Sequence, residues 1–370
     1  MSCGITTRLL GKLGDLSMSS FLKDYKGKSI LITGHTGFKG AWLARILVLA
    51  GADVYGLALE AEAGSLFSTI DDLGMKESTV LDIRDRAAIE NYFKSHRFDG
   101  IFHLAAQPLV RHSYKEPIET FETNVMGTAN LLNAVVNNKS AAWVVVITTD
   151  KVYRNVEKLG GYTEDEALGG KDPYSASKAA TEMAISAWQT IAAGLEQKIV
   201  IASARAGNVI GGGDSAQDRL IPDLIRGFHA GIKTVIRNPA SIRPWQHVLD
   251  PLNGYLMMGS ALMAGRTISR AYNFGPGDES KLTVKEMAEF ACTQWDGAKG
   301  IDIQIDPSAV HESGLLWLSS DLAAKELRWS NRFEAFEAIT WTTDWERAAM
   351  KTSPLSALDM QIHDFYGAKP

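Results

Sequence analysis

Short apolar runs alternate with stretches of helical periodicity over residues 29–206 of this 370-residue chain. The run at 142–148 (AWVVVIT) is apolar without a break, which is typical of a strand buried on both faces of a parallel sheet. Alternating strands and helices predict a doubly wound α/β fold with a parallel sheet. The predicted strands cover residues 29–33, 51–59, 79–83, 100–106, 142–148, 198–204 and 270–275, and the predicted helices include 86–98, 116–137 and 174–193.

The stretch 28–40 (KSILITGHTGFKG) joins the first predicted strand to a helix through three glycines at a spacing of three. Glycines permit a tight turn and let the backbone approach a pyrophosphate, and the N-terminus of the helix offers free N–H groups. A plain strand-to-helix turn would need one glycine, so the pattern predicts a dinucleotide site. The residues of this stretch assigned to the cofactor are Gly34, Thr36, Gly37, Phe38, Lys39 and Gly40.

The chain divides where its composition changes, after residue 205. We predict a dinucleotide-binding domain over residues 25–205, joined by a returning strand near 268–275. Residues 206–267 and 276–370, rich in Gly, Pro, Trp and Arg, are predicted to form a smaller mixed α/β substrate-binding domain. Residues 1–24 lack the long apolar segment of a signal peptide and are predicted to be a flexible extension.

Charge and composition exclude several classes of function. The net charge is −5 with no basic tract, which argues against nucleic acid and anionic membranes as partners. Two cysteines, Cys3 and Cys292, exclude a disulfide framework and a cysteine-rich metal site. We therefore expect no metal, and we expect the protein to lie in the reducing cytoplasm. No apolar run approaches the about 20 residues of a membrane span. After the second predicted strand, Glu60 is the only nearby acid and no arginine stands beside it, which favours NAD over NADP.

Tyr174 and Lys178 form a Y-x-x-x-K pair at the start of a predicted helix, so both lie on one face, one turn apart. A nearby ammonium favours the phenolate and should lower the pKa of Tyr174 from about 10 toward neutrality. Thr149 would hydrogen-bond the reacting hydroxyl. Asp150 and Lys151 follow it directly, at the carboxyl end of a strand, and suggest proton transfers beyond a simple oxidation.

These motifs are embedded in segments that resemble the sugar-nucleotide 4,6-dehydratases of the extended short-chain dehydrogenase/reductase superfamily. The segments include GHTGFKGAWL, AAQPLVRHSY, TTDKVY, GGKDPYSASKAATE, ARAGNVIGGGD, DRLIPD and IRNPASIRPWQHVLDPLNGYL, and the similarity runs over residues 21–367. The Asp150–Lys151 pair resembles the branch that acts on CDP-glucose. The resemblance implies a Rossmann sheet and assigns further residues to NAD, namely Asp82, Ile83, Leu104, Ala105, Ala106, Asn124 and Thr148, besides Tyr174 and Lys178.

By this resemblance the chain is a hydro-lyase that forms CDP-4-keto-6-deoxyglucose in deoxysugar (O-antigen or lipopolysaccharide) biosynthesis. Tyr174 would take the C4 hydroxyl proton while hydride passes to NAD. Asp150 would protonate the departing C6 hydroxyl, and Lys151 would remove the C5 proton or act only electrostatically. Hydride would then return to C6. The residues assigned to the substrate are Gln107, Asn208, Arg219, Arg243 and His247, of which Arg243 matches a diphosphate-binding position.

Three points stay open at this stage. A sugar-nucleotide 4-epimerase on the same scaffold and a non-catalytic NAD-binding regulator are the alternative functions. Relatives carry a second diphosphate arginine near HESGLLWLSSD, where this chain has His311 and no arginine. We expect a homodimer, with a tetramer as the alternative, formed through helices 116–137 and 174–193. An apolar stripe of Ile185, Trp188 and Ile191 would lie in the interface.

Overall fold

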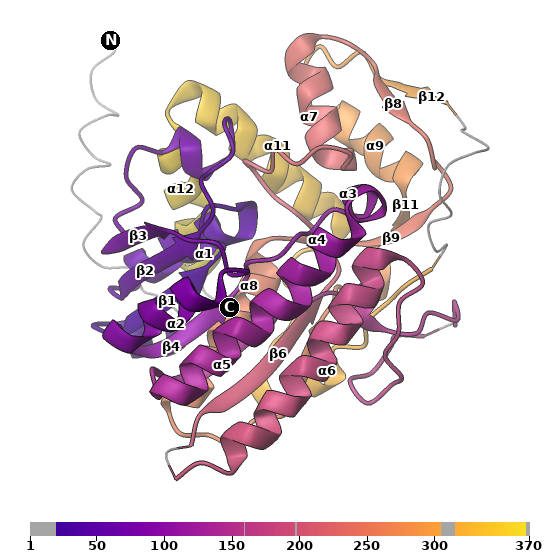
Figure 1. Cartoon of the computed structure of the whole chain (residues 1–370). Coiled ribbons are helices and arrows are strands. Elements are labelled where there is room, and N and C mark those ends of the chain that lie inside the picture. Colours follow the sequence, from indigo (N-terminus) through magenta and orange to yellow (C-terminus); the bar gives the residue numbers. More distant parts are fainter. Residues whose placement is uncertain (1–19, 159, 197, 305–314, 368–370) are drawn as a thin grey trace, which may run out of the picture.

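The computed structural model describes residues 20–158, 160–196, 198–304 and 315–367, and its centre is a parallel sheet of seven strands (Figure 1). The strand order is β10-β6-β5-β4-β1-β2-β3. The chain adds β2 and β3 on one side of β1 and the later strands on the other side, as expected for a doubly wound fold. The predicted fold class is confirmed. The strands are β1 (Ser29–Thr33), β2 (Asp53–Ala58), β3 (Glu77–Val80), β4 (Phe98–His103), β5 (Ala141–Ile147), β6 (Val200–Ala206) and β10 (Ala271–Phe274).

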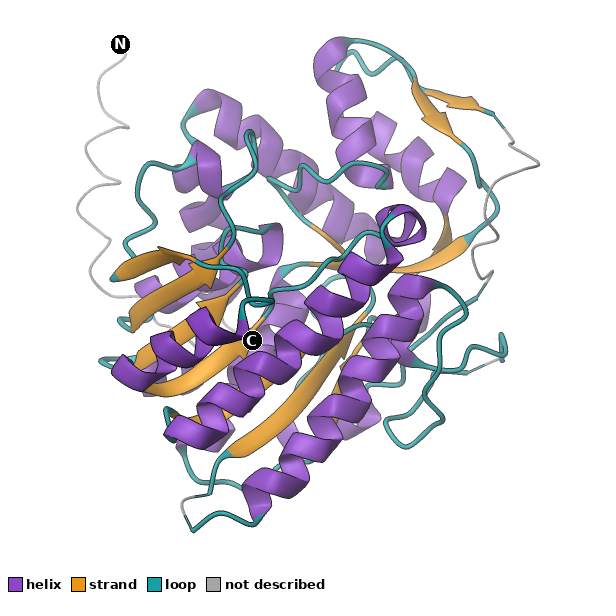
Figure 2. Cartoon of the chain, in the orientation of Figure 1, coloured by secondary structure: helices purple, strands orange, loops and turns teal. Residues whose placement is uncertain are grey.

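The sheet is buried on both faces because successive side chains of each strand enter opposite cores. In β5, Trp143 and Val145 join one apolar cluster, while Val144 and Val146 join the other. One face carries α2 (Arg86–Ser95), α5 (Thr128–Asn138) and α6 (Pro173–Ala193), and the other carries α1 (Phe38–Leu49), α8 (Leu249–Met263) and α12 (Pro354–Gly367) (Figure 2). No helix in the described ranges is long and apolar enough to cross a membrane.

The helix predicted over residues 116–137 is interrupted by a wide turn. The structure has α4 (Pro117–Phe121), a π-helical turn (Glu122–Gly127) and then α5. A π-helical turn inserts one residue into the helical ladder and is frequent at functional sites. Here it places Asn124, which is 1% exposed, toward the end of β4.

The smaller part of the molecule lies beyond the carboxyl ends of the strands (Figure 1). A three-stranded sheet joins β7 (Asn208–Ile210), β9 (Ile242–His247) and β11 (Lys281–Thr283), and a two-stranded sheet joins β8 (Thr234–Ile236) and β12 (Ile301–Ile303). The remaining helices are α3 (Val110–Lys115), α7 (Leu220–Ala230), α9 (Val284–Thr293), α10 (Asp321–Leu327) and α11 (Ala335–Lys351).

Two segments pack on a part of the molecule other than the one to which the sequence analysis assigned them. The helix α8, assigned to the smaller domain, packs on the main sheet, and Tyr25 donates a hydrogen bond to the Leu256 carbonyl at 2.7 Å. The predicted N-terminal extension lies outside the described residues up to position 19. Its last residues form a short 3-10 helix (Ser20–Tyr25) whose Leu22 is fully buried, so this end of the extension is held in the core.

Candidate active site

Two connected cavities open beyond the carboxyl ends of β1, β4, β5 and β6. The inner cavity, of about 460 Å³, is lined by Phe38, Lys39, Thr149 and Tyr174 among others. The outer cavity, of about 850 Å³, lies between α3, the loop before α6 and the strand β9. Asp150, Lys151, Asn208 and Arg243 line both. The structure therefore brings the residues predicted for chemistry and most of those predicted for the substrate to one place.

The glycine turn forms a cradle in which backbone segments approach one another closely. Gly34 has φ +74°, and a Cβ there would lie 2.7 Å from the backbone nitrogen of Ala105. A Cβ on Gly40 would lie 2.1 Å from the Gly34 carbonyl oxygen, so the helix can approach the turn only without a side chain there. A Cβ on Gly37 would meet only the Gly34 oxygen at 3.4 Å, which leaves the N-terminus of α1 open to a ligand. These residues fit a bound dinucleotide.

Thr36, at the start of the turn, donates a hydrogen bond to the Leu59 carbonyl at 3.1 Å. This contact brings the end of β2, with the exposed Glu60 just after it, beside the glycine cradle. In dinucleotide-binding folds, an acid after this strand commonly binds the adenosine ribose.

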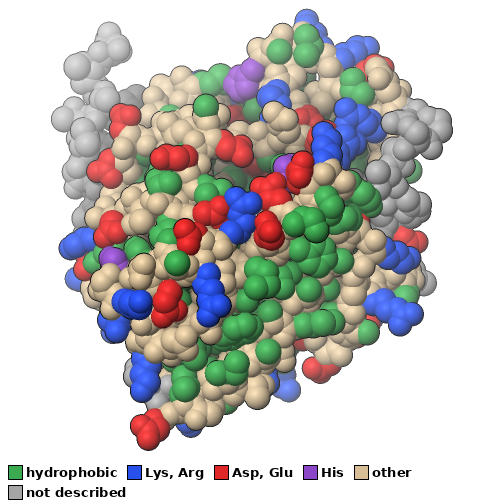
Figure 3. Space-filling model, viewed as in Figure 1, with side chains coloured by type: hydrophobic (Ala, Val, Ile, Leu, Met, Phe, Trp, Pro, Cys, Tyr) green, Lys and Arg blue, Asp and Glu red, His purple; other side chains and the backbone are tan. Residues whose placement is uncertain are grey.

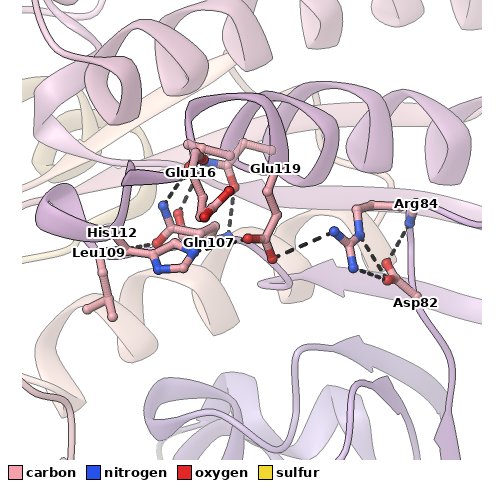
Figure 4. Close-up of polar contacts among 9 residues, drawn as sticks. Asp82, Arg84, Gln107, Leu109, His112, Glu116 and Glu119 are labelled. Atoms are coloured by element: carbon pink, nitrogen blue, oxygen red, sulfur yellow. Dashed lines mark hydrogen bonds and ion pairs between the residues drawn. The ribbon is translucent and has the colours of Figure 1, made fainter. Parts of the chain in front are cut away.

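Asn124 fixes the segment after β4. Its side-chain oxygen accepts from the Gln107 backbone N–H at 2.8 Å, and its Nδ2 donates to Ser177 Oγ at 2.9 Å. Leu104 and the small residues Ala105 and Ala106 thus lie between β4 and the segment that Asn124 holds. The side chain of Gln107, assigned to the substrate, is instead used internally: it donates to Thr120 at 2.8 Å and accepts from the Leu109 N–H at 2.5 Å (Figure 4).

Asp82, assigned to NAD, lies beyond the end of β3, and its carboxylate is engaged by Arg84 at 2.6 Å (Figure 4). Arg84 in turn faces Glu119 at 3.6 Å, and His112 lies 3.1 Å from the same carboxylate. The adjacent Ile83 is 4% exposed and packs on Gly127 of the π-helical turn. This exposed chain of charges links the end of β3 to α3.

The catalytic candidates gather around the start of α6. Asp172 caps this helix by accepting from the Ser175 N–H at 2.9 Å, and Pro173 occupies the first turn. Tyr174 and Lys178 follow on one face, and the Lys178 ammonium lies 3.5 Å from the Ile147 carbonyl at the end of β5. The Thr149 hydroxyl donates to the Asp150 carboxylate at 2.9 Å.

The pKa of Tyr174 corrects one expectation. Burial raises it to about 12, and the Thr149 hydroxyl opposes this only in part. The expected fall toward neutrality is wrong for this state of the site, because the phenol is 7% exposed and removing a phenolate from water outweighs the nearby charges. Burial also lowers the pKa of Lys178 to about 8, against a raising effect from Glu182.

Asp150 and Lys39 are also shifted by burial. The pKa of Asp150 is raised because the carboxyl is buried, although Lys151, Thr149 and Arg243 oppose the rise. A raised pKa suits a group that must donate a proton. The pKa of Lys39 falls to about 7, first through burial and then through the charges of Lys178 and Arg219. Its ammonium lies 5.8 Å from the ring centre of Tyr255.

Glu182 is a site residue that the sequence motifs did not indicate. Its carboxylate accepts from Thr148 Oγ1 at 2.5 Å, from Ser203 Oγ at 2.9 Å and from the Arg205 guanidinium at 2.9 and 3.0 Å. Thr148 was assigned to the cofactor; its hydroxyl is turned toward this buried network. The spacing Lys178–Glu182 is i,i+4, which was the available signal for a third group on the face that carries Tyr174.

The residues predicted for the substrate separate into two groups. Arg243 and Asn208 line both cavities, and Arg219 lines the inner one, where it pairs with Asp214 at 3.3 Å. His247 lies elsewhere: it is fully buried and makes edge contacts with Trp42, Phe333 and Trp341. The neighbouring Trp245 lines the inner cavity and donates to the Leu282 carbonyl at 3.1 Å.

The outer cavity also carries basic side chains that were not assigned to a ligand from the sequence, among them Arg111, Lys115, Lys171 and Arg237. They come from segments far apart in the sequence. His311, near which a second diphosphate arginine was sought, lies outside the described residues. Within the described ranges, no group of three or more His, Cys, Asp and Glu side chains could hold a metal ion.

Comparisons with known proteins place these features in context. A model of the GDP-mannose 4,6 dehydratase family matches residues 31–342. The CDP-glucose 4,6-dehydratase of Salmonella typhimurium LT2 is 44% identical over 353 residues, which are 93% of this chain and 98% of that protein. A UDP-glucose 4-epimerase of Halalkalibacterium halodurans is 27% identical over 325 residues, which are 84% of this chain and 93% of that protein.

Among solved structures, the dTDP-glucose 4,6-dehydratase DesIV from Streptomyces venezuelae, with NAD and TYD bound, gives a TM-score of 0.73 at 26% identity. The similarity covers 88% of this chain and 99% of that chain. It therefore includes both the main sheet and the smaller part of the molecule.

Proposed function

We propose, from the premise that the chain belongs to the GDP-mannose 4,6 dehydratase family, that it converts CDP-glucose to CDP-4-keto-6-deoxyglucose with NAD as the resident cofactor. The relative that is 44% identical carries the CDP-glucose activity in its name. The observation that carries the proposal is the buried Asp150 carboxyl, hydrogen-bonded to Thr149 beside Tyr174 and lining both cavities. Oxidation at C4 alone would not need it.

NAD supplies the hydride acceptor and donor when bound along the glycine cradle. Tyr174 takes the proton of the C4 hydroxyl as that carbon is oxidised, and Thr149 hydrogen-bonds the same oxygen. The buried Lys178 stabilises the phenolate that the oxidation requires. With a pKa of about 12 for Tyr174 and about 8 for Lys178, the charge of the ammonium is available to the phenol below about pH 8.

The 4-keto group then acidifies the C5 hydrogen, and water is lost across C5 and C6. Asp150 donates a proton to the departing C6 hydroxyl, consistent with its raised pKa. Lys151 lines both cavities next to it and removes the C5 proton. NAD held at the glycine cradle would supply the hydride for C6, and a proton would return to C5, so the reaction would involve no net redox change.

The substrate lies with its sugar in the inner cavity and its nucleotide in the outer one. Arg243 and Asn208, which line both, bind the diphosphate between them. Glu60, after β2, binds the adenosine ribose of NAD. We also propose that the reaction takes place in the cytoplasm. The 4-epimerase alternative accounts for Thr149, Tyr174 and Lys178 but gives no role to the Asp150–Lys151 pair.

The test is an incubation of the purified protein with CDP-glucose, followed by alkali, in which a 4-keto-6-deoxy sugar develops a near-ultraviolet chromophore. UDP-glucose and dTDP-glucose are assayed in parallel, with Tyr174→Phe as the inactive control. A product that is only the C4 epimer, without the chromophore, would replace this proposal with the epimerase.

We further propose that the protein is a homodimer. A band of apolar side chains is exposed over α4, the π-helical turn and α6 (Figure 3), and includes Ile118, Phe121, Met126, Met183 and Ile191. Exposed patches of this kind mark protein interfaces. A mass of about 40 kDa in light scattering at micromolar concentration would contradict the proposal.

This band differs from the predicted stripe. Ile191 is exposed, but Ile185 is 1% exposed and belongs to the core under α6, against which Trp188 also packs. The interface proposed here uses the opposite side of the helix, around Met183 and Ile191.

A further inference from the structure

Three charged side chains meet at the junction of the two cavities. The same oxygen of Asp218, Oδ1, accepts a hydrogen bond from Arg111 Nη1 at 2.9 Å and lies 3.4 Å from Arg237 Nη1. Arg111 comes from α3, Arg237 follows β8, and Asp218 precedes α7. We refer to Arg111, Asp218 and Arg237 as the junction cluster.

The junction cluster faces the ligand space. Arg111 and Asp218 line both cavities, as Arg243 does, and Arg237 lines the outer one. The three side chains are each 45–46% exposed, so a ligand can reach them. At this exposure the ion pairs are weak, and an anion of higher charge can compete with them.

The field at the junction favours an anion. The whole chain has a net charge of −5, yet eight Lys and Arg side chains and five carboxylates line the two cavities within the described residues. Two guanidinium groups that converge on one oxygen are arranged as they would be on a phosphate, which offers several oxygens in place of one. Asp218 supplies that single oxygen from a residue with φ +59°, a conformation that aspartate adopts more readily than most residues.

We propose that Arg111 and Arg237 form a second phosphate-binding point for the nucleoside diphosphate of the substrate, and that the Asp218 carboxylate holds this point until the ligand displaces it. The inference rests on the proposed function only in requiring that the ligand is a nucleoside diphosphate sugar. It supplies, from α3 and the segment after β8, the second cation that was sought near His311. Asp218 then acts as an internal competitor that weakens binding and speeds release of the product.

The test is Asp218→Asn in the full-length, NAD-loaded protein, with CDP binding measured by calorimetry. Asparagine keeps the shape of the side chain and removes its charge. CDP should bind about three- to tenfold more tightly, as expected when ion pairs of this exposure no longer compete. Binding of cytidine, which lacks phosphate, should not change. Asp344→Asn is the matched control, because it removes an exposed carboxylate that pairs with Arg347 away from both cavities.

A second variant makes the test specific to the cluster. Arg237→Gln should weaken CDP binding, and Asp218→Asn should give a smaller gain in that background than in the wild-type protein. The gain should also shrink at high salt. CDP binding to Asp218→Asn that is no tighter than to Asp344→Asn, or a gain of equal size with and without Arg237, would overturn the proposal.

Failure of the proposed function would be visible separately. The ratio of the UDP dissociation constants for wild type and Asp218→Asn depends on the diphosphate and not on the base. If the ratio persists while CDP-glucose gives no keto sugar, the junction cluster stands and the substrate assignment falls. If CDP-glucose is converted but wild type and Asp218→Asn have equal dissociation constants for UDP and also for CDP, the substrate assignment stands and the junction cluster falls.

Discussion

Two ion pairs of the same kinds of side chain lie in different surroundings, one buried under α6 and one exposed at the junction of the two cavities. In the inner pair, Glu182 of α6 and Arg205 of β6 are 4% and 5% exposed, and Glu182 also accepts hydrogen bonds from Ser203 of β6 and from Thr148 just after β5. In the outer pair, Asp218 and Arg111 are about ten times more exposed and belong to short, separate segments. Burial makes removal of one partner costly in the first case and mild in the second. The inner groups are thus fixed before the substrate arrives, whereas the outer groups can exchange partners with it.

The largest effect is expected from Tyr174→Phe. Without the phenol, the C4 hydroxyl has no base, so turnover should fall by roughly 10²–10⁴ and no NADH should form on the enzyme. Single-turnover absorbance of NADH with CDP-glucose measures this. Tyr114→Phe changes the same side chain in the outer cavity and should leave hydride transfer intact. NADH formation at the wild-type rate by Tyr174→Phe would remove this residue from the first step.

Lys151→Met should separate the oxidation from the elimination. Thr149, Tyr174 and Lys178 remain in place, so NADH should form, while elimination slows by roughly 10²–10⁴ for loss of a general base. Enzyme-bound NADH should accumulate, and exchange of the C5 hydrogen with deuterium from solvent should be lost. Lys171→Met, in the outer cavity, is the control. Normal deuterium incorporation in Lys151→Met would assign the C5 base to Asp150 or to water.

Glu182→Gln tests the buried network itself. It leaves Arg205 buried without its carboxylate, which should cost about 3–5 kcal/mol of unfolding free energy. Glu182 raises the pKa of Lys178, so the variant should also move the Lys178-dependent limb of the pH profile for hydride transfer to lower pH. The contrasting variant is Glu119→Gln, an exposed acceptor of Arg84 and His112, which should change stability by about 0.5 kcal/mol or less. Equal losses in both would erase the difference between the two regions.

A further prediction concerns Lys39 and the pH dependence of stability. Its pKa of about 7 in the folded protein lies below its ordinary value, so the unfolded chain binds more protons between pH 7 and about pH 10.5. Stability from this group therefore rises with pH across that window. Lys39→Met should be more stable than wild type at pH 7, with the difference shrinking toward pH 10. Thermal unfolding without added nucleotide measures it, and a difference that does not vary with pH would contradict the assignment.

The sequence predicted the main sheet because its signal is local. The apolar run of β5 and the glycine turn after β1 are each predicted by their own few residues, and both appear where expected. The junction cluster was not predicted: Arg111, Asp218 and Arg237 each lie in a segment that resembles the dehydratases, but only the folded chain brings the three segments together. His247 is the opposite case: a distinctive motif contains it, but its side chain is buried among aromatic rings and lines neither of the two cavities.

The electrostatic surroundings of the site residues could not be predicted from the sequence either. The Y-x-x-x-K spacing correctly placed Tyr174 and Lys178 on one helical face, but it does not contain the depth of burial, which decides the direction of the Tyr174 pKa. The π-helical turn at Asn124 is similar, since the apolar periodicity of residues 116–137 continues through it. In both cases the residue type could be read from the sequence, but the packing around the residue could not.

The position of α8 has a consequence for how the molecule comes apart. This helix follows β9 of the smaller part, yet its Leu249, Leu252 and Tyr255 share one apolar cluster with Ile30 of the first strand and Phe365 near the end of the described chain. The cofactor side and the substrate side therefore share the core on this face of the sheet. The two sides should therefore unfold together, and a fragment that ends before α8 would keep β1 to β6 of the main sheet but lose β10 and the helix that covers this face.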